Sequence, residues 1–264
     1  MKKRFGQHLL ADKIYLEKIL NVTNLKPSDV VLEIGAGTGL LTCLLAKRVK
    51  KVFAVELERD IIKKLKENLN NDELKNVVVV EKDFLGLDIK HLVKHEVKVI
   101  GNIPYNITSQ ILLKLCGEID KPALHLNMIK NIYLMMQLEV AERIVAKPNS
   151  KAYSPLSLLV QWVALPKILF KVPRQVFYPV PKVDSAFVKF EIRQNPQFVQ
   201  NPTLLKNIIR TAFQQRRKKI INSLDKLIKD KNHIACVFDK LKLSHNLRAE
   251  NISLEEYVAI SNII

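Results

Sequence analysis

The chain has 264 residues, of which 48% are hydrophobic and 26% charged, a balance typical of a folded globular protein and not of a disordered one. Its 43 Lys and Arg against 26 Asp and Glu leave a formal charge of +17, which favours a polyanionic partner such as nucleic acid or anionic lipid. A basic surface without a partner is the alternative. No apolar run approaches the roughly 18 residues of a membrane span, and no long apolar stretch follows the basic N-terminus, so we expect a cytoplasmic protein.

Three cysteines, Cys43, Cys116 and Cys236, are far apart and form no Cys-x-x-Cys pair. This pattern suits a reducing compartment and gives no support for a structural zinc site.

Short β-branched runs alternate with amphipathic stretches from residue 30 to about residue 136. Strands are predicted at Val30–Ile34, Val52–Glu56, Val77–Val80 and Val97–Gly101, with further candidates at Ala123–Met128 and Ile132–Met136. Helices are predicted at Leu40–Val49, Arg59–Leu69 and Ile107–Cys116. Because the strand runs lack polar alternation and helices separate them, they predict a mostly parallel sheet covered on both faces. Such a sheet binds its ligands beyond the carboxyl ends of the strands.

Prolines interrupt strand-like runs between residues 166 and 193. A polar stretch then lies between Asn195-Pro196 and Asn201-Pro202 and is typical of a linker. Residues 203–264 have helical spacing and no convincing strand. We therefore predict an α/β domain over residues 1–194 and a small all-helical domain over residues 195–264.

A glycine-rich segment, Glu33-Ile34-Gly35-Ala36-Gly37-Thr38-Gly39, follows the first predicted strand. Glycines permit a sharp turn and let a ligand approach where a Cβ would collide. Glu56 ends the next strand, where its carboxylate can accept hydrogen bonds from ribose hydroxyls. The Gly-x-Gly-x-Gly spacing is similar to the adenosylmethionine loop of Rossmann-like methyltransferases and differs from the Gly-x-Gly-x-x-Gly of nicotinamide sites. A structural turn is the alternative.

Asp83 ends the third strand and precedes Phe84. A carboxylate there could accept a hydrogen bond from an adenine amino group while the apolar neighbour covers the ring. Taken alone, Asp83 would be a turn or cap residue. Its place in register with Gly35 and Glu56 on the two preceding strands favours the cofactor role.

The segment Asn102-Ile103-Pro104-Tyr105 ends the fourth strand and points to amino-group chemistry. An amino nitrogen conjugated to an aromatic ring is a poor nucleophile because its lone pair is delocalised. The Asn102 side-chain oxygen and a nearby main-chain carbonyl could hold its two N–H bonds, and Pro104, with fixed φ and no N–H, lets this carbonyl point into the site. Tyr105 offers a face on which an extruded base can stack. A proline turn beside a core tyrosine is the alternative.

Several segments match one family in order, and they are Phe5-Gly6-Gln7-His8-Leu9-Leu10, Glu33 to Gly39, Glu56, Asp83, Asn102 to Tyr105, Val176 to Val188 and Ala212 to Lys218. In this combination the chain resembles the rRNA adenine N6-dimethyltransferase family over nearly its whole length, and most closely the bacterial small-subunit (16S) branch. The resemblance implies a Rossmann-like class I methyltransferase fold with a helical C-terminal domain, and S-adenosylmethionine as methyl donor.

The resemblance also implies a role for each matching residue. The cofactor would be bound by His8, Leu10, Gly35, Gly37, Glu56, Asp83 and Asn102, with the first two closing over it from the N-terminal segment. Tyr105 and Phe177 would sandwich the target adenine beside Asn102 and Pro104, although Phe177 could be an ordinary core residue. His8 is a departure, since many members have Asn there, and it could add a pH dependence.

The predicted helical domain carries Arg216, Arg217 and Lys218, dense enough to follow a phosphate backbone, with a solvated helix face as the alternative. In the family this domain shapes the RNA-binding cleft. Because phosphate contacts position RNA without reading its sequence, substrate choice would come from the shape of the folded RNA.

The activity implied by the resemblance is dimethylation of two adjacent adenines in the hairpin loop near the 3′ end of small-subunit rRNA, on a pre-30S particle and by a monomer. A large-subunit rRNA methyltransferase of the macrolide-resistance type shares the glycine loop and the Asn-x-Pro-Tyr segment. The Tyr178-to-Ser185 run and the Gln215-to-Lys218 tail favour the small-subunit enzyme. A ribosome assembly factor whose binding role dominates is a further alternative, whereas a nicotinamide dehydrogenase is excluded by the glycine spacing.

Overall fold

A computed structural model describes residues 8–194 and 197–264. The predicted linker residues Asn195 and Pro196, and the Phe5-Gly6-Gln7 part of the N-terminal motif, lie outside the described residues. The chain divides into two compact units, and each is described by itself. The first unit runs from the first described residue to Leu115 and adds Ala123–Ala141 and Leu165–Ile192, while the second takes the remaining segments.

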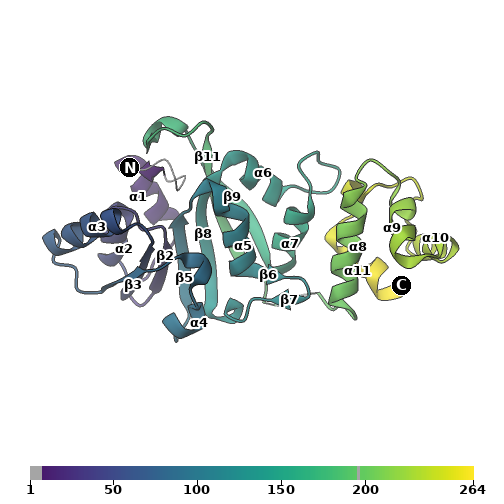
Figure 1. The fold of residues 1–264 in the computed structure, drawn as a ribbon, viewed down its shortest axis with the longest axis horizontal. Coiled ribbons are helices and arrows are strands. Elements are labelled where there is room, and N and C mark those ends of the chain that lie inside the picture. Colours follow the sequence, from purple (N-terminus) through teal and green to yellow (C-terminus); the bar gives the residue numbers. More distant parts are fainter. Residues whose placement is uncertain (1–7, 195–196) are drawn as a thin grey trace. The chain divides into compact units, whose positions relative to one another are not determined.

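A seven-stranded sheet in the order β4-β3-β2-β5-β8-β11-β9 forms the centre of the first unit (Figure 1). Its strands are β4 (Val77–Glu81), β3 (Lys51–Glu56), β2 (Val30–Ile34), β5 (Val97–Asn102), β8 (Ile129–Gln137), β11 (Ser185–Ile192) and β9 (Ala164–Val172). The strands from β4 to β8 run parallel, and β11 pairs antiparallel with β8. The strand order reverses between β2 and β5, so the ligand-binding position of an open α/β sheet lies at the carboxyl ends of these two strands.

The helices α1 (Lys13–Val22), α2 (Leu40–Ala46) and α3 (Arg59–Asn71) cover one face of this sheet, and α4 (Ile89–Leu92) and α5 (Thr108–Cys116) lie over the other (Figure 1). Val31 and Leu32 point to opposite faces of β2 and are both fully buried, which is why the strand sequences show no polar alternation. A core of apolar side chains joins α1, α2 and α3 to the sheet residues Val31, Val52 and Phe187. This packing fixes the strand ends that carry the predicted site.

The mostly parallel sheet and its helices confirm the predicted fold class, but the strand expected at Ala123–Met128 is wrong. The chain there makes tight turns, with the Leu126 N–H bonded to the Ala123 carbonyl and the Met128 N–H to the His125 carbonyl, followed by the longer strand β8. Leu124 is 78% exposed, so this apolar run does not supply a second buried strand. A short apolar stretch without a partner strand has no ladder to join.

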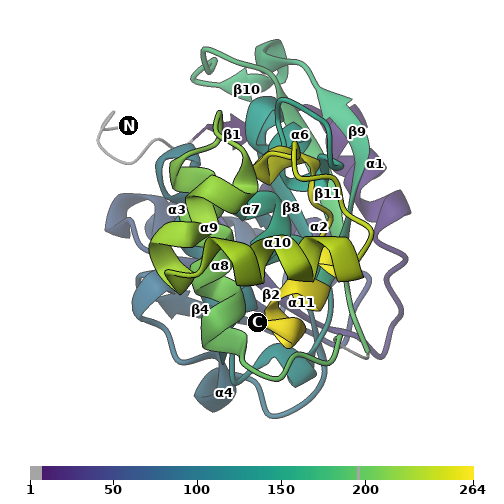
Figure 2. The ribbon, with the colours of Figure 1, turned by 90° about the vertical axis from the view of Figure 1, so that its right-hand side faces the viewer.

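The second unit is helical in its C-terminal part, with α8 (Pro202–Gln214), α9 (Ile220–Ile228), α10 (Lys231–Lys240) and α11 (Leu254–Ile263), and α8, α9 and α10 pack in succession (Figure 2). It also takes in α7 (Pro155–Val163), the second half of α6 (Leu138–Val145) and the small hairpin β6–β7 (Gly117–Glu118 and Lys121–Pro122). This unit therefore extends beyond residues 195–264. The Tyr153 and Phe213 rings lie 6.2 Å apart, and Lys206 Nζ lies 2.9 Å from Asp120 Oδ1, which attaches these earlier segments to α8.

No helix within residues 8–194 and 197–264 is long and apolar enough to cross a membrane. Over the same ranges, no cluster of three or more His, Cys, Asp or Glu side chains could hold a metal ion. The three cysteines are free thiols, with Cys116 buried, Cys43 half-buried and Cys236 exposed.

Candidate active site

Sheet register brings three predicted site residues to one edge. Ile34 pairs with Val55 on β3 and with Gly101 on β5, so Gly35, Glu56 and Asn102 follow at neighbouring strand ends. The Gly35 and Ala36 N–H groups donate to the Val55 carbonyl at 3.0 and 3.1 Å, which folds the glycine loop back over β3.

The glycine loop adopts backbone conformations that L side chains rarely take. Gly35 has φ +72° and Gly37 has φ +56°, both in the left-handed region. A Cβ on Gly35 would lie 3.1 Å from the main-chain oxygen of Asn102, and a Cβ on Gly37 would lie 2.8 Å from Leu9 Cδ2. The loop is thus closely approached by β5 on one side and by the N-terminal segment on the other.

Glu56 fixes this loop from β3. Its Oε2 accepts the Gly37 N–H at 2.9 Å, and its Oε1 accepts the Leu57 and Glu58 N–H groups at 2.8 and 3.0 Å. The residue is 3% exposed, so the carboxylate is buried but hydrogen-bonded, as a buried charge requires. A carboxylate at the end of this strand is the kind of acceptor that binds ribose hydroxyls in dinucleotide-binding α/β sheets.

A cavity of about 180 Å³ lies beside Glu56 and contains Asp83 in its wall. Its lining is otherwise largely apolar and comprises Ile34, Val55, Leu57, Phe84, Leu85, Pro104, Ile107 and Ile111, with Gly35, Glu56, Lys82 and Asn106. Asp83 Oδ1 accepts the Leu85 N–H at 2.9 Å, which caps a short 3₁₀ turn and holds the carboxylate at the cavity rim. An apolar slot with one acceptor matches a flat heterocycle that carries an amino group.

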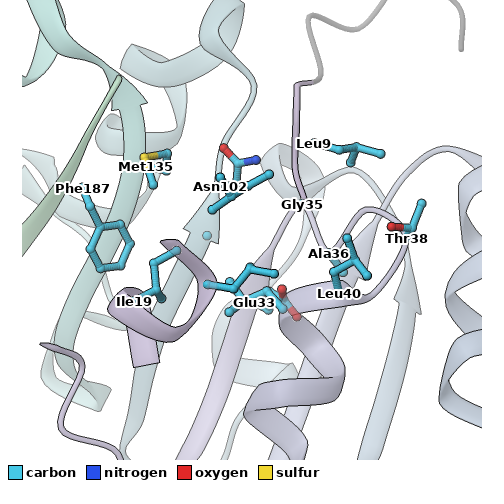
Figure 3. Close-up of a pocket in the computed structure, with 14 residues that line it drawn as sticks. Leu9, Ile19, Glu33, Gly35, Ala36, Thr38, Leu40, Asn102, Met135 and Phe187 are labelled. Carbon is cyan, nitrogen blue, oxygen red and sulfur yellow. The ribbon is translucent and has the colours of Figure 1, made fainter. Parts of the chain in front are cut away.

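Asn102 has its amide orientation fixed by the N-terminal segment. Its Nδ2 donates to the His8 main-chain oxygen at 2.7 Å, and because a carbonyl can only accept, Oδ1 must face the opposite way. Figure 3 shows the amide nitrogen on the side of the N-terminal segment and the oxygen turned away from it. The Pro104 carbonyl accepts from the Ile107 N–H and Thr108 Oγ1, each at 3.3 Å, which leaves the Ile103 carbonyl as the main-chain candidate for a second acceptor.

Tyr105 is held from two directions. Its hydroxyl lies 2.5 Å from Ser185 Oγ at the start of β11, and its ring centroid lies 5.2 Å from that of His8. His8 Nδ1 in turn lies 2.6 Å from the Pro179 carbonyl, so this ring nitrogen carries the proton. Burial raises the pKa of the Tyr105 phenol, so the side chain stays neutral at physiological pH. Ser185 and Pro179 were not among the predicted site residues, although both lie in the Val176-to-Val188 segment.

Phe177 and Leu10 occupy the core beneath this region. They pair across the two-stranded sheet of β1 (Leu9–Leu10) and β10 (Phe177–Tyr178), and their side chains are 2% and 6% exposed. Phe177 therefore packs as a core residue in this conformation, the alternative that its sequence context had left open. An aromatic sandwich with Tyr105 would need the ring of Phe177 to become uncovered.

Glu33, the first residue of the glycine segment, was missed as a site residue. Its carboxyl group lies under the glycine loop beside Ala36 and Leu40 (Figure 3), in the wall of a small cavity that Gly35 and Asn102 also line. The residue is 2% exposed, and its Oε2 has no hydrogen-bond partner within the described part of the chain. Burial raises the pKa of Glu33 to about 8. The sequence signal was an acid at an inward-facing strand position two residues before the first glycine.

The basic segment of the second unit divides into two kinds of residue. Arg216 Nε lies 2.6 Å from Glu250 Oε2, and its Nη2 donates to the Lys151 carbonyl at 2.6 Å, so this guanidinium links three segments of the unit. Arg217 and Lys218 are exposed. Of the predicted RNA-binding residues, these two present free surface for a phosphate group.

The site fits S-adenosylmethionine on three observations. Added Cβ atoms at the glycine positions would crowd the loop, and an apolar slot has an acceptor at its rim. Within the described residues, one oxygen of the buried Glu33 carboxyl beside the loop has no hydrogen-bond partner. Together with the strand order, they define a class I methyltransferase with a Rossmann-like sheet.

The chain belongs to the ribosomal RNA adenine dimethylase family, whose model matches residues 1–264. It is an S-adenosylmethionine-dependent rRNA adenine dimethyltransferase. Similar proteins include a ribosomal RNA small subunit methyltransferase A from Acaryochloris marina, 39% identical over 100% of this chain and 97% of the relative, and one from Crocosphaera subtropica, 41% identical over 99% and 97%. Among solved structures, a dimethyladenosine transferase from Plasmodium falciparum has a TM-score of 0.81 at 28% identity over 96% of both chains. The 23S rRNA methyltransferase ErmE has a TM-score of 0.75 at 26% identity over 97% of this chain and 98% of that one.

Proposed function

We propose that this protein dimethylates N6 of two adjacent adenines in the hairpin loop near the 3′ end of small-subunit (16S) rRNA, acting in the cytoplasm as a monomer on the pre-30S particle. The names of the relatives from Acaryochloris marina and Crocosphaera subtropica support the small subunit as substrate. The orientation of Asn102 carries the chemical part of the proposal, because the bond to His8 turns its side-chain oxygen away from the N-terminal segment at the switch point of the sheet.

Residues at the strand ends would hold the cofactor. Gly35 and Gly37 would let its methionine part approach the main chain, Glu56 would accept from the ribose hydroxyls, and Asp83 would accept from the adenine amino group within the 180 Å³ cavity. His8 and Leu10 would close the site from the N-terminal segment, where the His8 carbonyl already binds Asn102. When bound, S-adenosylmethionine supplies an electrophilic methyl group.

The protein's own contribution to the transfer is to position and polarise the amine. Asn102 Oδ1 and the Ile103 carbonyl would accept the two N–H bonds of N6, which draws the nitrogen toward tetrahedral geometry and frees its lone pair. Tyr105 would stack on the extruded ring and hold it in line. Alignment and fixed dipoles supply the rate enhancement, so a side-chain nucleophile is not required.

Substrate binding would use the exposed cations of the second unit. Arg217 and Lys218 would contact phosphates, whereas Arg216 would act by holding the turn that carries them. Such contacts weaken with salt and position the RNA without reading bases.

Methylation of undermethylated small-subunit particles and of intact large-subunit RNA, side by side with labelled cofactor, tests the substrate. We expect label in the small-subunit rRNA, and mass mapping should place it on two neighbouring adenines. Label in large-subunit RNA alone would instead support the activity of the 23S enzyme ErmE, to which the fold is also similar.

An Asn102→Ala variant separates catalysis from a binding role in assembly. We expect it to bind particles normally and to lose activity by roughly 10²–10³-fold, the usual effect of removing one preorganised polar group. Asn127→Ala, at an exposed asparagine of the first unit, is the matched control. A fully active Asn102→Ala enzyme would contradict the proposed mechanism.

A further inference from the structure

An exposed apolar cluster lies on the segment between β9 and β11. Tyr178 is 72% exposed, Val180 is 55% exposed and Val183 is 43% exposed, within six positions of the chain. Strand alternation explains the contrast at β10, since Phe177 faces the core while Tyr178 faces outward. Exposed apolar surface that forms a larger patch marks an interaction site on a folded protein.

This segment is held in place, so Tyr178 is presented in a defined position. The Arg174 N–H donates to Asp184 Oδ1 at 3.0 Å, and Arg174 Nη1 donates to the Lys182 carbonyl at 3.0 Å, which closes the segment on itself. The Tyr178 main chain pairs with Leu9 in the β1–β10 sheet, whose two strands lie side by side in Figure 2. Stacking on a fixed ring costs less conformational entropy than stacking on a mobile one.

The cluster is connected to the active site through His8. His8 Nδ1 bonds to the carbonyl of Pro179, the residue after Tyr178, and the His8 ring lies 5.2 Å from the ring of Tyr105. Through His8, the main chain next to Tyr178 is therefore linked to the ring on which the target adenine would stack. The side chains of Arg174 and Lys182 are exposed on the same segment and supply positive charge for an RNA strand entering there.

We propose that Tyr178 is a stacking platform for the nucleotide that flanks the target adenine, a proposal that rests on the proposed function. A base extruded toward Tyr105 leaves its neighbour without a stacking partner. Tyr178 replaces that partner, with Val180 beside it and the cations of the segment near the phosphates. When one of two adjacent adenines is stacked on Tyr105, the other stacks on Tyr178.

The test compares Tyr178→Ala, Tyr178→Leu and Tyr178→Phe in steady-state methylation of undermethylated small-subunit particles. Loss of a base–aromatic stack corresponds to about 5- to 150-fold in affinity, so we expect Tyr178→Ala to raise KM for the particle within that range. Tyr178→Leu keeps apolar bulk without a ring and should behave like Tyr178→Ala, whereas Tyr178→Phe should retain most of the affinity. The Kd for S-adenosylmethionine, measured by calorimetry, and the Tm should stay at wild-type values.

Leu124→Ala is the matched control, because Leu124 is 78% exposed in the same unit and lies outside the site. It should leave KM for the particle unchanged. An unchanged KM in Tyr178→Ala would overturn the platform, as would a Tyr178→Leu variant that equals Tyr178→Phe. Wild-type enzyme that methylates only large-subunit RNA would overturn the proposed substrate instead, and the same variants would then be compared on that RNA.

Discussion

Substitution of the glycines in the loop tests how the site is held together. Gly37→Ala places a Cβ at φ +56° and 2.8 Å from Leu9 Cδ2, so the backbone is strained and the Leu9 side chain must move. Left-handed backbone costs an L residue about 1–2 kcal/mol. Leu9 belongs to the segment whose His8 carbonyl orients Asn102, so its displacement should weaken cofactor binding as well.

The free variant relieves this strain by leaving the loop conformation that the cofactor needs, and binding must restore it. The expected loss is therefore about 5- to 30-fold in affinity for S-adenosylmethionine, the equivalent of 1–2 kcal/mol. Leu9→Ala removes the atom that collides with the new Cβ, so the double variant should recover part of the lost affinity. The part that comes from the strained backbone at residue 37 should remain. Gly35→Ala is the contrasting case. Its Cβ would lie 3.1 Å from the Asn102 main-chain oxygen, which no side-chain truncation can relieve.

The measurement is the Kd for S-adenosylmethionine by calorimetry, with thermal melting as a check on folding. It compares the two single glycine variants, Leu9→Ala and both double variants. We expect rescue of Gly37→Ala by Leu9→Ala and none of Gly35→Ala. Equal rescue of both, or rescue of neither, would refute the reasoning, because the two close approaches involve different atoms.

Three further predictions concern residues around the site. Ser185→Ala and Tyr105→Phe should each lower kcat on the particle several-fold, and the double variant should lose no more than the stronger single one, because both remove the same 2.5 Å hydrogen bond. Glu33→Gln should flatten the pH dependence of the unfolding free energy. In the wild type, burial raises the pKa of Glu33 from the ordinary 4.5 to about 8, so between these values the folded state keeps the proton and the unfolded state does not. The unfolding free energy of the wild type therefore falls by about 1.4 kcal/mol per pH unit as pH rises through that window. Lys98→Ala should cost about 3–5 kcal/mol of unfolding free energy, because Lys98 Nζ lies 2.8 Å from Asp29 with both groups largely buried.

Each of these has a direct control. Additive losses of kcat in the Ser185 and Tyr105 variants would show that the two side chains act independently. A Glu33→Gln protein whose urea midpoint follows pH as steeply as wild type would place the titration elsewhere. Lys130→Ala removes an exposed ion pair with Glu96 and should change the unfolding free energy by less than about 1 kcal/mol. If Lys98→Ala changed the unfolding free energy by as little as Lys130→Ala, the pair of Lys98 and Asp29 would not be buried in solution.

The order of strands and helices was predictable because parallel strands buried on both faces have an unambiguous composition. The ends of β2 and β3 and the start of β5 agree with their predicted positions to within one residue, and the glycine loop, Glu56 and Asn102 follow from them. The strand expected at Ala123–Met128 failed because the identity of a short apolar run depends on whether a partner strand lies beside it. Composition also does not show which helices pack together. The sequence therefore did not predict that the second unit includes segments far apart in the chain.

The sequence by itself determined the residue types at the strand ends and hence the class of chemistry, because a parallel sheet carries all its carboxyl ends to one edge. Only the tertiary structure decided how those groups face. The Asn102 amide is oriented by a main-chain oxygen 94 positions away, and Arg216 is committed to Glu250. Packing of the loop also leaves one oxygen of the Glu33 carboxyl without a hydrogen-bond partner among the described residues. Hydrogen-bond direction and burial depend on atoms brought together from distant parts of the chain, and no local pattern records them.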